Sequence, residues 1–372
     1  MLISYNMKKN SAHLYAIVLA GGGGTRLWPV SRKNTPKQIL TFIGKQTLLQ
    51  TTMKRIRKVI PVSRTYVVTN IRNKKDIEKQ LRGFNKKNIL YEPEKRDTAA
   101  AIGFAAAVIH ARDPQAVVTT VNSDGFIQNE NEYVRLLLSA AQLAFDHKGS
   151  TVLIGVRPTY PETGYGYIKM GKQLKGGKKD QNVYHVECFI EKPNLQTAKK
   201  YLKRWEYLWN PTMFVWHIGT LMHLYQKFLP RHYVLIKKIE QAAHKNLVQK
   251  VVKKEFFKFI PISIDYGIME KTTDMLVLPA NFGWADIGHW RSVKDVLSKN
   301  KKENIIKGLH VGLNTEGSLI YGYSNRLIAT IGLSDLVIVD TPDILLVCPK
   351  EKSQEVKKIV DMLNKKGFTQ YV

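Results

Sequence analysis

Cysteine is scarce in this sequence, and long apolar runs are missing. The 372 residues include only Cys188 and Cys348, so the chain can form one disulfide at most and is not a disulfide-held scaffold. No apolar run reaches the roughly 18 residues that a membrane helix needs, so we expect no membrane segment. The seven-residue run Leu14–Ala20 lies at the lower limit for a signal peptide. Together these absences favour the cytoplasm.

Acidic residues are also few for a chain of this length. Lys and Arg number 58 against 30 Asp and Glu, which gives a formal charge of +28. Such an excess favours anionic partners, including nucleic acids, membrane surfaces and phosphorylated metabolites. The basic residues, however, are scattered doublets such as Lys86-Lys87 rather than one block of five or more. We therefore expect a solvated surface and no nucleic-acid partner.

The first 160 residues alternate short β-rich runs with helical stretches. This alternation predicts an α/β fold with a Rossmann-like, mostly parallel sheet flanked by helices. The expected strands are 15–20, 65–69, 88–91, 116–121 and 151–156, with helical segments such as 48–59 and 98–111. Ligands of such sheets bind beyond the carboxyl ends of the strands, so the loops after Ala20, Tyr91 and Val121 are the places to search.

The pattern of residue types along the sequence changes near residue 300. Residues 305–347 are short β-like runs broken by glycines, and a Lys-rich helical segment closes the chain. A few turns of a β-helix would fit this pattern. We expect a flexible tail over residues 1–13, a catalytic domain over 14–300, and a small C-terminal β-rich, β-helix-like segment with a terminal helix over 301–372.

The strongest local signal is AIVLAGGGGTRLWPVSRKNTPKQ, residues 16–38, where a hydrophobic strand runs into four glycines and then basic residues. Glycines let backbone N–H groups approach an anion closely, and Arg26 and Lys37 supply fixed positive charge. The pattern thus indicates a phosphate loop. It matches neither the Walker motif, since Ile39 stands at the first glycine position, nor the dinucleotide fingerprint.

Beyond this loop, the sequence resembles nucleotide-sugar pyrophosphorylases, and within them mannose-1-phosphate guanylyltransferases. The resemblance spans nearly the whole chain. Its motifs are TPKQ (35–38), EPEKRDTAAAI (92–102), VNSDGFI (121–127), ETGYGYI (162–168), FIEKP (189–193), WNPTMFVW (209–216), SIDYGIMEK (263–271) and GWADIGHW (283–290). It implies the nucleotide-diphospho-sugar transferase type of fold. It also implies attack by a sugar 1-phosphate oxygen on the α-phosphorus of GTP, giving GDP-mannose and pyrophosphate.

The resemblance assigns roles to particular residues. Arg26 and Lys37 would hold the triphosphate and stabilise charge on the α-phosphate and the leaving pyrophosphate, a task that needs positioning and charge rather than a protein nucleophile. Asp124 and Asp286 would hold a divalent metal, expected to be Mg²⁺, which prefers hard oxygen ligands. The expected nucleotide-binding residues are Leu19, Ala20, Gly21, Gly22, Gly23, Gly24, Thr25, Asp97 and Thr98. The expected sugar-phosphate-binding residues are Gly164, Tyr165, Glu191, Lys192, Asn210 and Asp265.

Three places depart from the family pattern. Gly125 follows the metal aspartate where histidine is usual, Pro211-Thr212 replaces Ser-Gly, and Asp97-Thr98 replaces Asn-Thr. The Asp97 carboxylate would accept both N1–H and N2–H of guanine, a hypothesis that stands beside simple capping of the following helix. Replacing Asp97 by Asn and comparing GTP with ATP separates the two.

Two alternatives to GDP-mannose synthesis stay open. The same chemistry with another sugar 1-phosphate, such as a heptose phosphate, or with another nucleotide fits the motifs equally well. A catalytically silent regulatory homologue would keep the fold. The longer members of the family add a cupin domain with phosphomannose isomerase activity, so we expect none here. An exposed apolar face on the C-terminal β segment would allow a homodimer.

Overall fold

The computed structural model describes residues 11–175, 182–323 and 325–372, and the chain forms two compact units. The first unit contains the described residues up to 21 together with 53–123 and 127–284. The second contains residues 22–52, 124–126 and 285–372. The glycine loop from Gly22 onward and one short later stretch, residues 124–126, therefore belong with the C-terminal part of the chain.

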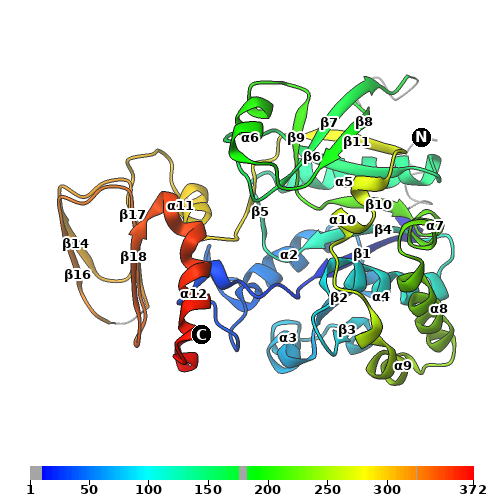
Figure 1. Cartoon of the computed structure of the whole chain (residues 1–372), viewed down its shortest axis with the longest axis horizontal. Coiled ribbons are helices and arrows are strands. Elements are labelled where there is room, and N and C mark those ends of the chain that lie inside the picture. Colours follow the sequence, from blue (N-terminus) through cyan, green and yellow to red (C-terminus); the bar gives the residue numbers. More distant parts are fainter. Residues whose placement is uncertain (1–10, 176–181, 324) are drawn as a thin grey trace. The chain divides into compact units, whose positions relative to one another are not determined.

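A ten-stranded sheet forms the centre of the first unit (Figure 1), in the order β11-β8-β7-β9-β6-β10-β4-β1-β2-β3. Its strands are β1 (Leu14–Leu19), β2 (Thr65–Asn70), β3 (Ile89–Glu92), β4 (Val117–Asn122), β6 (Thr151–Val156), β7 (Gly166–Gln173), β8 (Tyr184–Ile190), β9 (Tyr207–Asn210), β10 (Phe214–His217) and β11 (Met275–Ala280). Strands β1 to β4 are parallel, as expected. Beyond β4 the sheet is mixed: β10 runs antiparallel to both β4 and β6, and β7 pairs antiparallel with β8 and β9. Strands β9 and β10 both pair antiparallel with β6, so the two run in the same direction.

The helices of the first unit are α3 (Lys74–Gln80), α4 (Asp97–Arg112), α5 (Glu130–Asp146), α6 (Leu195–Leu202), α7 (Ile218–Phe228), α8 (Pro230–His244), α9 (Val248–Glu255) and α10 (Ile264–Gly267). Helix α4 is alanine-rich and buried along most of its length. At Gly103 an added Cβ would lie 2.6 Å from Ile236 of α8, so the absence of a side chain permits this close approach. Side chains of β1, α4, α7 and α8 share one apolar core, whereas α5 contacts β4, β6 and β10.

The second unit is built around short parallel strands. Strands β13 (Ile305–Lys307), β15 (Leu319–Gly322) and β17 (Leu336–Asp340) pair in parallel, with β18 (Leu345–Pro349) antiparallel at the end. Strands β14 (His310–Leu313) and β16 (Ile328–Ile331) form a second parallel pair. This stacking confirms the expected β-helix-like segment. Helices α11 (Trp290–Leu297) and α12 (Val356–Lys365) pack with it, and the core includes Trp290, Tyr321 and Val339.

Three elements contain residues of both units: α2 (Leu48–Ile56) and the strands β5 (Gly125–Ile127) and β12 (Trp284–Asp286), which pair with each other. Most of the expected tail lies outside the described residues, but its last three residues, Ser11–His13, form a 3-10 turn, and the His13 imidazole contacts Asp113 at 2.8 Å. None of the described helices combines the length and apolarity needed to cross a bilayer.

Candidate active site

The glycine loop wraps around the side chain of Lys37. Gly24 has a φ of 62°, and a Cβ at this position would lie 2.8 Å from the Lys37 Cβ and would also collide with the Ser31 hydroxyl. Gly22 lies beside the same side chain, since a Cβ at Gly22 would be 3.6 Å from the Lys37 Cε. The loop therefore needs glycine for its left-handed turn and for its contact with the lysine.

Lys37 bridges two carboxylates within the second unit. Its ammonium forms an ion pair with Asp124 and lies 3.9 Å from Asp286. The lysine is only 8% exposed. Burial acts to lower the pKa of Lys37, but the two aspartates outweigh it and the pKa is raised, so the side chain stays charged.

Backbone pairing brings the two aspartates together although they are far apart in sequence. The Ile287 N–H donates to the Asp124 carbonyl at 3.1 Å, next to the paired strands β5 and β12. Among the described residues no group of three or more His, Cys, Asp or Glu could hold a metal by itself. Two carboxylates that already share one cation do fit a Mg²⁺ ion whose remaining ligands are waters and substrate phosphates.

Arg26 lies close to the same carboxylates. A Cβ at Gly288 would lie 3.4 Å from Arg26 Nη2 and in collision with Asp286, which places both side chains around this glycine. The Arg26 guanidinium donates to Gln354 at 2.7 Å. Sequence reasoning missed Gln354, since nothing in its Lys-rich surroundings marks it as a partner of the glycine loop.

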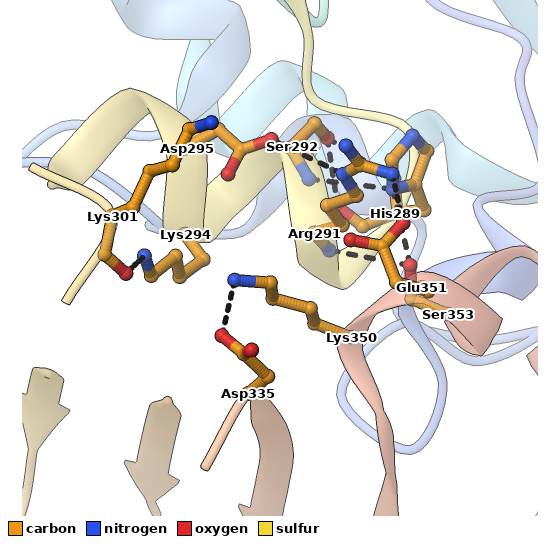
Figure 2. A network of polar contacts seen from close by, with 10 residues as sticks. All are labelled: His289, Arg291, Ser292, Lys294, Asp295, Lys301, Asp335, Lys350, Glu351 and Ser353. Carbon is orange, nitrogen blue, oxygen red and sulfur yellow. Dashed lines mark hydrogen bonds and ion pairs between the residues drawn. The ribbon is translucent and has the colours of Figure 1, made fainter. Parts of the chain in front are cut away.

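A buried histidine, His289, lies three residues after Asp286 and forms part of a polar network (Figure 2). His289 follows the Asp286 strand and caps α11, accepting the Ser292 N–H at 3.3 Å, while its Nδ1 is 3.3 Å from the Ser353 hydroxyl. Burial, together with the nearby positive charge of Arg26, lowers the pKa of His289 to about 3. The imidazole is therefore neutral and acts as a hydrogen-bond acceptor. Arg291 on the same helix pairs with Glu351.

Of the other expected nucleotide-binding residues, Gly23 and Thr25 lie in the second unit, whereas Leu19, Ala20, Gly21, Asp97 and Thr98 lie in the first. Ala20 continues β1, and its N–H donates to Val68 of β2 at 2.8 Å. Asp97 has a φ of 64°, and its carboxylate accepts the Thr98 N–H at 2.7 Å at the start of α4, a contact that fits the capping interpretation. The Thr98 hydroxyl accepts the Ile264 N–H at 2.8 Å, so both side chains already have backbone partners.

Glu92 is a buried carboxylate that begins the motif EPEKRDTAAAI but was given no role in the sequence analysis. It ends β3, is 5% exposed, and its Oε2 would lie 3.3 Å from a Cβ at Gly21. Its carboxylate forms no hydrogen bond within the described residues, and burial raises the pKa of Glu92 to about 8. The sequence signal that could have identified Glu92 is its position at the carboxyl end of a parallel strand, where ligands of such sheets bind.

Four of the expected sugar-phosphate residues form one polar cluster in the first unit. Asn210 donates to Asp265 at 2.9 Å, and Glu191 pairs with Lys192. Burial and the neighbouring Glu191 raise the pKa of Asp265 to about 7. A Cβ at Gly166 would collide with Glu191, so this glycine makes room for the carboxylate. The cluster holds two carboxylates and an amide, which are largely buried, and the ammonium of Lys192, whose side chain is 50% exposed.

Gly164 and Tyr165 lie beside this cluster in different ways. The Gly164 N–H donates to Glu162 at 2.7 Å. The Tyr165 ring packs edge-on against Trp209 and Trp284, with centroids 5.4 and 5.2 Å apart. Tyr165 therefore contributes to an aromatic group.

Comparisons with known proteins agree over most of the chain. Residues 15–303 match the nucleotidyl transferase family, and residues 308–363 match a MannoseP isomerase/GMP-like beta-helix domain. The chain is 36% identical to mannose-1-phosphate guanylyltransferase 2 of Escherichia coli O157:H7 over 98% of its own length and 76% of the relative's. A mannose-1-phosphate guanylyltransferase of Escherichia coli K12 is also 36% identical, over 95% and 74%. A crystal structure from Thermus thermophilus, described as a mannose-1-phosphate geranyltransferase, is 32% identical with a TM-score of 0.83, covering 95% of this chain and 99% of that one.

Proposed function

Because the chain belongs to the nucleotidyl transferase family of mannose-1-phosphate guanylyltransferases, we propose that it transfers GMP from GTP to α-D-mannose 1-phosphate. The products are GDP-mannose and pyrophosphate. A phosphate oxygen of the sugar phosphate forms a bond to the α-phosphorus while the bond to the β-phosphate oxygen breaks. The leaving pyrophosphate takes the electron pair, so no protein nucleophile is required.

The observation that carries this proposal is the charged lysine between Asp124 and Asp286 behind the glycine loop. Two anionic substrates repel each other, so a site for this reaction must neutralise phosphate charge. Lys37 and Arg26 supply fixed cations, and the N–H groups of the glycine loop supply donors. We propose that Asp124 and Asp286 hold Mg²⁺, which when bound neutralises further phosphate charge.

Guanine recognition is best assigned to the first unit. A carboxylate accepts from the N1–H and N2–H donors of guanine, which adenine lacks. Glu92 is the better candidate, because the Asp97 carboxylate already accepts a helix N–H whereas that of Glu92 has no described partner. Glu92→Gln should reduce the preference for GTP over ATP, and Asp97→Asn should leave it unchanged. The reverse result would return the role to Asp97.

The polar cluster around Asp265 is the proposed sugar site. Glu191, Asp265 and Asn210 offer acceptors and a donor for sugar hydroxyls, and Lys192 offers a charge for the sugar phosphate. The Lys192 ammonium also lies 5.8 Å from the centre of the Tyr266 ring. This donor set suits a phosphorylated sugar but does not favour mannose over a heptose, so the assay must include both.

Pyrophosphate release tests the whole assignment. The full chain with Mg²⁺ is assayed with GTP, ATP, UTP, CTP and dTTP against mannose, glucose and heptose 1-phosphates. Release confined to GTP with mannose 1-phosphate is expected. Release with another pair would reassign the substrate, and no release from a folded chain that still binds GTP would favour a regulatory homologue.

A first prediction concerns the metal. Asp286→Asn should lower the rate by about 10²- to 10³-fold and raise the Mg²⁺ concentration needed for half-maximal rate. The matched control is Asp343→Asn, which removes a carboxylate of the same unit that pairs with Arg32 at 2.6 Å and is 41% exposed. Equal loss in both variants would contradict the metal assignment. Weaker binding of Mn²⁺ to Asp286→Asn, followed by electron paramagnetic resonance, gives a readout separate from activity.

We further propose a homodimer that forms through the β14 and β16 pair. The inward side chains of this pair include His310 and Thr330, which are 2.9 Å apart, while the outward Val311, Leu313 and Ile331 are 57%, 60% and 73% exposed. Exposed apolar faces of this kind mark interaction sites. We place the working enzyme in the cytoplasm, with residues 14–300 as its catalytic domain and no nucleic acid among its partners.

A further inference from the structure

A large cavity lies beside the edge strand β3, and none of its lining residues has a role in the reaction proposed above. Its volume is about 980 Å³, at the upper end of the range for small-molecule sites. It is lined by α3, by the residues that lead into β3, by the last turn of α4, and by the connection between α8 and α9 (Figure 1). All of these elements belong to the first unit. We call this feature the basic cavity.

The basic cavity is separated from Asp97 by the length of α4. Asp97 begins this helix and Arg112, which lines the cavity, ends it. At about 1.5 Å per residue the two positions are roughly 22 Å apart along the axis. Tyr91 of the lining directly precedes Glu92 in β3, but successive side chains of a strand point to opposite faces of the sheet.

The charge of the lining is strongly positive. Its charged side chains are Lys74, Lys86, Lys87, Arg112, Lys250 and the single acid Glu78. Glu78 is already engaged, since it accepts the Tyr91 hydroxyl at 2.9 Å and pairs with Lys86 at 3.2 Å. Lys87 and Lys250 form no ion pair with any residue that the structure describes. Concentrated cations on a concave surface attract an anion.

The start of α9 adds to this attraction. Leu247 precedes the helix without a side-chain cap, and Val248, Gln249 and Lys250 of its first turn line the cavity. The first N–H groups of a helix are donors that a phosphate can use. Helices α4 and α8 end at the cavity, but each carries a basic residue in its last turn, so their carbonyl ends are offset.

The rest of the lining is apolar and aromatic. Tyr66, Ile89, Leu90 and Tyr91 contribute buried surface, and the Lys74 ammonium lies 5.5 Å from the centre of the Tyr91 ring. Leu247 is 46% exposed at the rim. A simple inorganic anion would use only the cations and leave this surface bare. The combination suits a molecule with a phosphate group and a planar or apolar body.

From these features we infer that the basic cavity is a second ligand site, which binds a phosphorylated small molecule of nucleotide size. Charge selects the phosphate end through Lys87 and Lys250 together with the first turn of α9. The apolar wall around Tyr91 selects the body. The inference does not depend on the reaction proposed above, because none of its residues takes part in that reaction.

Calorimetric titration of the full chain with GDP, without Mg²⁺, tests this inference. The wild type should bind two GDP molecules, and the double variant Lys87→Glu/Lys250→Glu should lose one of them or bind it about tenfold or more weakly. The matched control is Lys253→Glu/Lys254→Glu, which makes the same charge change on α9 outside the cavity and should keep both. The variant Lys37→Met should still show the GDP binding that is lost in Lys87→Glu/Lys250→Glu.

The possible outcomes separate the two proposals. One GDP in the wild type that disappears in Lys87→Glu/Lys250→Glu supports the cavity and counts against the nucleotide site of the proposed function. One GDP that persists in that variant overturns the cavity proposal. Binding of polyglutamate that GDP does not displace would also overturn it, since the cavity would then serve an acidic polypeptide. Inorganic phosphate should compete far more weakly than GDP.

Discussion

Single residues in the first unit carry charges that burial disfavours, and Glu92 is the clearest case. Its pKa is raised from 4.5 to about 8, so the folded state holds a proton that the unfolded chain releases. The stabilisation from this group is complete below pH 4.5 and is lost as the pH rises through 8. The ionised Glu92 carboxylate thus lowers the stability of the free protein, although it is the form proposed to accept the guanine donors.

Glu92→Gln should remove this pH dependence because the amide cannot ionise. Its free energy of unfolding should exceed that of the wild type by roughly 4 to 5 kcal/mol above pH 8, and the difference should vanish near pH 4.5. Urea denaturation at several pH values measures this. Glu94→Gln is the matched control, since its carboxylate is 48% exposed and pairs with Arg96 on the surface. A pH-independent difference in both variants would contradict the assignment.

Thr212 shows the cost of one departure from the family pattern. It stands where the family has glycine and adopts a φ of 58°, a conformation that a β-branched residue rarely takes. Its N–H donates to the Asn210 side chain at 2.9 Å, which holds Asn210 toward Asp265. The strain therefore lies next to the proposed sugar site.

Thr212→Gly should stabilise the protein by about 1 kcal/mol, because the left-handed conformation costs glycine little. Thermal unfolding should show the higher midpoint. As control, Asn314→Gly changes another residue with positive φ, 51°, where asparagine is well tolerated, and should have a smaller effect. A lower midpoint for Thr212→Gly would mean that the threonine contacts outweigh the strain.

Among the secondary structure elements, α11 is the one that ties the Asp286 strand to the C-terminal segment. Its first turn is closed by a capping box in which His289 and Ser292 exchange hydrogen bonds, and Ser353 approaches the same imidazole (Figure 2). Because burial lowers the pKa of His289 from 6.5 to about 3, its contribution to the free energy of unfolding should rise with pH between about 3 and 6.5 and stay constant above 6.5. The cap thus fixes where the helix begins, shortly after Asp286.

His289→Ala should cost about 1 to 2 kcal/mol of stability through loss of the cap. It should also lower activity by displacing Asp286, whereas His289→Asn, which keeps an acceptor, should recover most of both. Chemical denaturation and the Mg²⁺ dependence of the rate provide the two measurements. Equal effects of the two substitutions would show that imidazole packing, rather than capping, is what matters.

For the molecule as a whole, the apolar face of β14 and β16 decides the expected oligomeric state. Val311→Glu places a charge on this face and should convert the dimer to a monomer, as native mass spectrometry would report. Val234→Glu on α8 is the matched control, since Val234 is 56% exposed and Val311 57%. A wild type that is monomeric at micromolar concentration would refute the homodimer.

Much of the architecture could be predicted from the sequence because it depends on local patterns. The strand before the glycines, the alanine-rich helix and the change of texture near residue 300 all correspond to observed elements. Alternation of strands and helices predicted the parallel strands β1 to β4. It did not predict the antiparallel half of the sheet, since pairing direction depends on which distant strands meet.

The sequence by itself determined the phosphate loop, the order of the motifs and the residue types that could bind anions, a metal and a sugar. Only the tertiary structure decided which of these residues meet. It brought Lys37 to Asp124 and Asp286, Arg26 to Gln354, and the Ile264 N–H to the Thr98 hydroxyl. It also left Glu92 buried without a described partner and formed the basic cavity from three distant stretches. The physical reason is that burial and long-range contacts set pKa values and cavities, and neither is encoded within a short stretch of chain.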